Sequence, residues 1–158
     1  MNDVIKTLLY SYPSFDAVVE ATDKLVYYKA ITSYKNNSKT CDQMNEILAL
    51  NERSSRICWI KGVIDRLLSE LTTFERQLVE YKYFHIDKAY DFDPSSRGYF
   101  RKQLKLEKTI EKLLDYLKPD EEWFMENLGD IYFLRSKYKK IKKMSECGRK
   151  NSAKERNL

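Results

Sequence analysis

A chain of 158 residues with only 4 glycines and 3 prolines can bury one hydrophobic core but lacks the frequent turn residues of a β fold, which favours an all-α class. Its three cysteines are isolated and it has a single histidine, so a disulfide framework, a zinc ribbon and a multi-histidine metal centre are excluded. No run of about 20 apolar residues and no leader-like N-terminus is present, so we expect a cytoplasmic protein without a membrane span.

The net charge of +5 is unevenly distributed along the chain. Residues 133–158 alone hold ten basic and two acidic side chains. Such an excess favours an anionic partner, either nucleic acid or an acidic protein surface, although a basic end can also serve only to keep a protein in solution.

Residues 1–70 are predicted to form a helical N-terminal part. A short apolar segment over 4–12 stops at Pro13, and Ser14 is a plausible N-cap for the next helix. That helix has a stripe at helical spacing that should face a core, made of Phe15, Val18, Val19, Thr22, Leu25, Val26 and Ile31. A further helix begins near Thr40, with Met44, Ile47 and Leu48 inward. The polar patch at 51–55 is either a turn or the surface of one long helix.

Residues 71–118 contain two well-marked helix starts. Thr72 and Glu75 have the spacing of a capping box, which predicts a helix to about Phe84. The acidic segment 85–94 ends in Pro94, so a new N-cap is expected at Ser95 or Ser96 and a second helix to about residue 117.

The first turns of this second helix are the candidate site. Hydroxyl, basic, aromatic and amide side chains are the groups that contact phosphates and base edges in a DNA groove. The predicted DNA-binding residues are Ser95, Ser96, Arg97, Tyr99, Arg101, Lys102, Gln103 and Lys105. The second half of the helix should instead face the core through its leucines and Ile110. The alternative is a solvated basic face without a ligand.

Residues 119–145 should form a C-terminal amphipathic helix, with acidic residues in its first turn and lysines in its last turns, as the helix dipole favours. Trp123 and Phe124 lie on its apolar side, as core residues or as a docking surface. Residues 146–158 lack apolar periodicity and are predicted to be a basic disordered tail. The expected organisation is a single helical domain over 1–145.

Residues 71–84 resemble the start of the promoter-reading C-terminal region of bacterial RNA polymerase sigma factors, through a leucine, charged residues and a terminal aromatic pair in similar order. The helix that begins at Ser95 or Ser96 is similar to the recognition helix of that region. By this pattern the chain resembles small sigma-like regulators of Gram-positive phages and integrated elements, the ArpU type. The resemblance implies a sigma-like helix-turn-helix variant and activation of late or mobile-element genes.

We therefore expect a transcriptional regulator of a phage or mobile element that binds double-stranded DNA and acts with RNA polymerase. We expect no enzymatic activity, no cofactor and no metal, because His85 is better explained as a helix-end residue than as a base. The rival hypothesis is a helical interaction protein or phage assembly adaptor that does not bind DNA. An enzyme is a third alternative, and the oligomeric state stays open.

Overall fold

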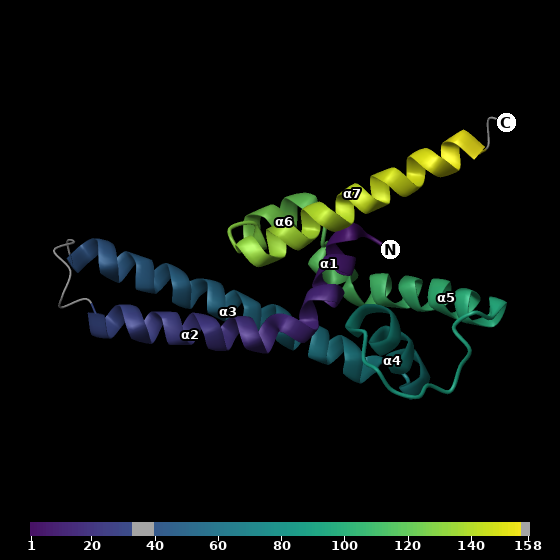
Figure 1. Ribbon diagram of the computed structural model, residues 1–158, viewed down its shortest axis with the longest axis horizontal. Coiled ribbons are helices and arrows are strands. Elements are labelled where there is room, and N and C mark those ends of the chain that lie inside the picture. Colours follow the sequence, from purple (N-terminus) through teal and green to yellow (C-terminus); the bar gives the residue numbers. More distant parts are fainter. Residues whose placement is uncertain (33–39, 156–158) are drawn as a thin grey trace. The chain divides into compact units, whose positions relative to one another are not determined.

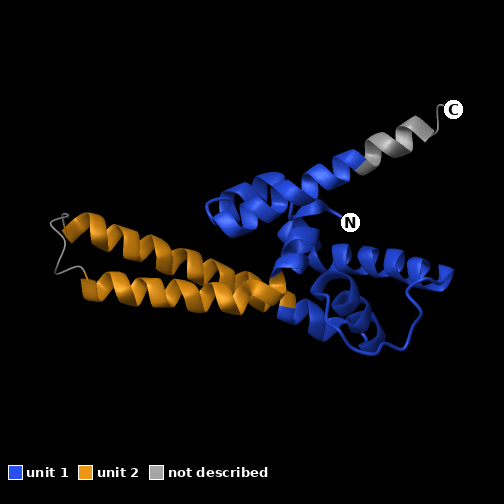
Figure 2. Ribbon diagram, in the orientation of Figure 1, with its two compact units in different colours: residues 1–11, 65–158 blue, residues 12–64 orange. Residues whose placement is uncertain are grey.

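The computed structural model describes residues 1–32 and 40–155, with side chains described as far as residue 147. Every regular element in these ranges is helical, which confirms the predicted all-α class (Figure 1). The chain divides into two compact units, where a single domain over 1–145 was predicted. Unit 1 comprises residues 1–11 and 65–158, and unit 2 comprises residues 12–64 (Figure 2).

Unit 2 is a helical hairpin. After a single 3-10 turn (Tyr12–Ser14), helix α2 (Phe15–Thr32) and the first part of helix α3 (Thr40–Glu70) run side by side. Side-chain contacts show that the two helices are antiparallel. Lys61 Nζ lies 2.5 Å from a carboxylate oxygen of Asp16, and Lys29 Nζ lies 2.5 Å from one of Glu46. Helix α3 passes through residues 51–55 without a break, so this polar patch is the surface of one long helix and not a turn.

The predicted core stripe of α2 is buried only in part. Its half-buried members are Val18, Val19, Thr22 and Val26. Only Phe15 of that stripe is buried, together with Ile57, Ile60 and Ile64 of α3. Leu25 is 42% exposed and Ile31 is 52% exposed. The cause lies within the hairpin, because two helices that pack on each other bury only the narrow seam between them.

Unit 1 contains the remaining elements. They are α1 (Asp3–Ser11), α4 (Thr73–Val79), a π-helical turn η3 (Glu80–Phe84), α5 (Arg97–Leu114), a 3-10 turn η4 (Asp115–Leu117), α6 (Glu121–Leu128) and α7 (Tyr132–Glu155). Helix α1 packs against α7 and η3. The core is formed by fully buried side chains of every one of the longer helices, among them Leu8, Leu9, Leu78, Ile110, Phe124 and Leu134. Phe124 stacks on Tyr138 with ring centroids 4.7 Å apart.

The single C-terminal helix predicted over 119–145 is two helices, because the chain breaks at Gly129 and Asp130. A Cβ atom at position 129 would lie 2.4 Å from the carbonyl oxygen of Met125, so the close approach of the backbone there requires glycine. Helix α7 then continues to Glu155, past residue 145, where the sequence predicted the disordered tail to begin. The last residues of that tail, 156–158, lie outside the described residues.

Candidate nucleic-acid interface

Helix α5 begins at the predicted N-cap. The Ser96 hydroxyl accepts a hydrogen bond from the backbone N–H of Tyr99 at 3.1 Å and donates one to the carbonyl of Asp93 at 2.8 Å. Ser95 donates to the Asp93 carboxylate from both its backbone N–H (2.9 Å) and its hydroxyl (2.7 Å). Both hydrogen bonds lower the pKa of Asp93, and the bond from the Ser95 hydroxyl has the larger effect. Both serines therefore act in the turn and the cap that begin the helix.

Tyr99 and Gln103, predicted to face DNA, are turned inward. Their side chains are only 9% and 3% exposed. The Gln103 amide donates to the carbonyl oxygen of Leu78 at 3.1 Å and to the Tyr99 hydroxyl at 3.3 Å, which fixes α5 against α4. The prediction of exposure was wrong because the buried face of α5 extends to its first turn. Tyr99 and Gln103 are therefore core residues and not surface residues of α5.

An aromatic cluster attaches the connecting segment 85–96 to both helices. The ring of Phe92 lies 5.6 Å from the ring of Tyr81, 5.6 Å from that of Tyr99 and 5.2 Å from that of Tyr90, measured between centroids. Phe74 of α4 contacts Phe92 from a further side at 5.9 Å. Because such pairs each add stability beyond area burial, the start of α5 is held in a defined orientation.

The opposite side of α5 is a continuous basic face. At ~100° per residue, its five cations lie within an arc of about 80° that is centred about 180° from the buried positions. All five are exposed: Arg97, Arg101, Lys105, Lys108 and Lys112. None of these side chains has an ion-pair or hydrogen-bond partner within the part of the chain that the structure describes. We call these five residues the α5 basic face.

Many cations elsewhere are compensated. Lys24 pairs with Glu20 in α2, Lys88 with Glu80 beside the connecting segment, and Lys142 with Glu121 across α6 and α7. Within the described residues the five cations of the α5 basic face form no ion pair, although Glu111 and Asp115 line the same hollow as Lys108 and Lys112 near the C-terminal end of the helix. Five cations without ion pairs along one face produce a positive potential that an extended anion can neutralise.

Two large apolar side chains border the α5 basic face. Phe100 is 59% exposed and Leu104 is 63% exposed. Groups of this kind contact thymine methyl groups in the major groove. The sequence prediction missed them, and it also missed Lys108 and Lys112. All four repeat at three- or four-residue intervals from Arg97 and Arg101, so helical periodicity could have found them.

Lys102, also predicted to bind DNA, lies about 60° outside the arc at ~100° per residue. Its ammonium group lies 4.2 Å from the centroid of the Phe74 ring. This cation–π contact leaves the charge exposed but ties the side chain to α4. Six of the eight predicted residues thus stay near the surface, and three of those six belong to the α5 basic face.

The connection between α4 and α5 differs from a standard helix-turn-helix. That motif uses a turn of about 3–4 residues. Here η3 ends at Phe84. The next residue, His85, has its backbone in the left-handed region with φ of 52°, and residues 86–96 follow before α5 begins. The connection is therefore longer than the turn of a helix-turn-helix, and the sigma-like variant of that motif is not confirmed.

Within the described residues, no group of three or more His, Cys, Asp and Glu side chains is arranged to hold a metal ion. No helix in that part of the chain is both long and apolar enough to cross a bilayer. In comparisons with protein-family models, curated proteins and solved structures, no match to this chain was found.

Proposed function

We propose that the protein binds double-stranded DNA through the α5 basic face and acts as a transcriptional regulator. The observation that carries this proposal is the set of five exposed cations without ion pairs on one face of a rigidly held helix. From Arg97 to Lys112 the face is about 22 Å long at ~1.5 Å rise per residue. An α-helix of this width fits the major groove, and a face of this length spans about two-thirds of a helical turn of B-DNA.

The charge alone supports backbone contacts, and the bordering residues support base contacts. Arg97 and Arg101 have the planar fork that pairs with guanine edges or phosphates, while Phe100 and Leu104 offer apolar surface to thymine methyls. The proposal is tested by fluorescence anisotropy with a pool of random duplexes over a series of salt concentrations. Binding whose logarithm falls linearly with the logarithm of salt supports it, and salt-independent or undetectable binding contradicts it.

The sigma-like resemblance adds RNA polymerase as a partner within the same proposal. Phe124 is excluded as a contact because it is fully buried, whereas Trp123 is half-buried on the same helix. Trp123→Glu should therefore leave DNA binding intact and weaken binding to purified bacterial RNA polymerase. Global unfolding of this variant would show instead that Trp123 stabilises the core. Unchanged polymerase binding in a folded variant would count against this docking site.

The second candidate function is a helical interaction protein, and the exposed apolar residues of unit 2 favour it. They are Leu25, Tyr27, Tyr28, Ile31, Met44 and Leu48, each at least 42% exposed. Contiguous exposed apolar surface is typical of protein interaction sites, and within this set Met44 and Leu48 lie one turn apart on α3 and line the same groove. If the random-duplex experiment shows no binding, this candidate replaces DNA binding as the function.

A further inference from the structure

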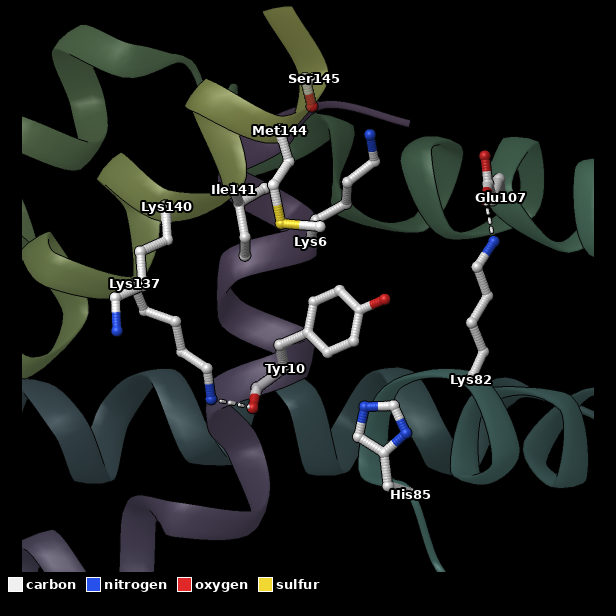
Figure 3. A pocket seen from close by; sticks show the side chains of 10 residues that line it. All are labelled: Lys6, Tyr10, Lys82, His85, Glu107, Lys137, Lys140, Ile141, Met144 and Ser145. Carbon is white, nitrogen blue, oxygen red and sulfur yellow. Dashed lines mark hydrogen bonds and ion pairs between the residues drawn. The ribbon is translucent and has the colours of Figure 1, made fainter. Parts of the chain in front are cut away.

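Unit 1 contains an open pocket away from the α5 basic face. It is formed by α1, η3, α5 and α7, and its volume is about 660 Å³ (Figure 3). Pockets that hold small molecules have volumes of about 300–1,000 Å³. Its lining comes from four helical elements that are far apart in the sequence.

The middle of the pocket is apolar. Tyr10 of α1 presents its ring there, and Ile141 and Met144 of α7 lie across from it (Figure 3). The Tyr10 ring is itself immobilised, because it meets the Tyr83 ring edge-on at 5.0 Å and stacks on His85 at 5.9 Å. A flat or aliphatic ligand body would find a preformed surface on this ring.

On the α5 side of the pocket the charges are already compensated. Glu107 accepts a hydrogen bond from Lys82 Nζ at 2.6 Å, and the N-terminal ammonium lies 3.4 Å from its other carboxylate oxygen. Burial alone would raise the pKa of Glu107, but the hydrogen bond and charge of Lys82, together with the N-terminal ammonium, lower it. Lys6 is paired with Asp3 at 3.3 Å.

On the α7 side two lysines have no carboxylate partner among the described residues. Lys137 donates to the backbone carbonyl of Tyr10 at 2.5 Å, which is a neutral acceptor, and Lys140 lies one turn further along the helix. Burial, and then the neighbouring Lys140, lower the pKa of Lys137. The pocket therefore combines an apolar floor with uncompensated positive charge at one side.

We propose that this pocket binds a small organic anion, whose apolar body lies against Tyr10, Ile141 and Met144 and whose carboxylate, phosphate or sulfonate pairs with Lys137 and Lys140. A concave site with apolar walls suits a small molecule better than a nucleic-acid backbone, which needs an extended charged surface. The inference is independent of DNA binding, because no residue of the α5 basic face lines the pocket.

The test uses two fluorescent probes on the purified full chain. One is 8-anilinonaphthalene-1-sulfonate, an aromatic anion, and the other is N-phenyl-1-naphthylamine, its uncharged counterpart. Lys137→Met keeps the length of the side chain and removes its charge, so the anion should bind about tenfold or more weakly while the neutral probe binds as before. Lys139→Met is the matched control, because Lys139 is exposed on the same helix and does not line the pocket.

A second variant guards against a folding artefact. Met144 is 74% exposed, so Met144→Glu should fold normally, which circular dichroism checks. Its carboxylate would place a negative charge in the lining of the pocket and should weaken binding of the anionic probe. Equal affinity for the anion in the wild type and in both pocket variants would overturn the proposal and place the probe elsewhere, for example on the hairpin of unit 2. Equal losses in Lys137→Met and Lys139→Met would also overturn it, since only overall charge would matter.

Discussion

Removal of two charges from the α5 basic face should change the salt dependence of DNA binding by a calculable amount. The variant Arg101→Gln/Lys105→Gln removes two exposed cations one turn apart from the middle of the face. Glutamine keeps helix propensity and a long side chain, and neither residue has a partner whose loss would destabilise the fold. Its effect on binding therefore reports on contact with DNA.

The magnitude follows from counterion release. Each neutralised phosphate contributes about 0.9 to the slope of log K against log salt, so five contacts give a slope of about −4.5 and three give about −2.7. Between 50 and 200 mM salt, the wild type should lose about 500-fold in affinity and the variant only about 40-fold. The two slopes therefore differ by about 1.8, which an anisotropy titration can resolve.

The matched control is Lys139→Gln/Lys143→Gln. It removes the same net charge at the same spacing from exposed positions of α7. Its slope should equal that of the wild type, with at most a small uniform loss of affinity. If both double variants shift the slope equally, general charge and not the α5 basic face governs binding. If only the α7 variant shifts it, the interface has been assigned to the wrong helix.

Three further predictions concern stability. Gln103→Ala removes a buried amide that donates a hydrogen bond to a backbone carbonyl of α4, so the free energy of unfolding in urea should fall by about 1–3 kcal/mol. The salt slope of DNA binding should stay unchanged, and a shallower slope would mean that Gln103 contacts DNA. Gly129→Ala forces a Cβ atom into the preceding turn and should lower the free energy of unfolding by about 1–3 kcal/mol. Gly62→Ala lies inside α3 with open space around its Cβ atom and should raise that free energy by about 0.5–1 kcal/mol. Similar effects of the two substitutions would contradict a steric role of Gly129. The folded-state pKa of Glu107 is below its ordinary value of 4.5, so the stability that its carboxylate contributes is present above that pH and is lost as pH falls through the folded pKa. Both Glu107→Gln and Lys82→Met should therefore reduce the fall in melting temperature below about pH 4.5. Melting curves parallel to those of the wild type would contradict this.

Local signals in the sequence predicted much of the helical structure correctly. The capping box at Thr72 and the N-cap at Ser96 both form as predicted, with the side-chain oxygen of each accepting from the backbone N–H three residues later. Such caps depend only on residues within one turn, so a sequence is sufficient to identify them. The all-α class follows for the same reason, because helix propensity and periodicity are local properties.

The sequence by itself could not determine which faces become buried. Periodicity shows that a helix has an apolar side but not how many partners cover it, so the stripe of α2 looked like core although its hairpin leaves Leu25 and Ile31 exposed. In α5 a polar residue predicted to be exposed is buried. The side chain of Gln103 is accommodated there because the carbonyl oxygen of Leu78, 25 residues earlier in the chain, accepts its hydrogen bond. The pocket of unit 1 is also a product of tertiary structure alone. It joins Tyr10 to Lys137, and no local pattern relates side chains so distant in sequence; only the packing of α1 against α7 brings them together.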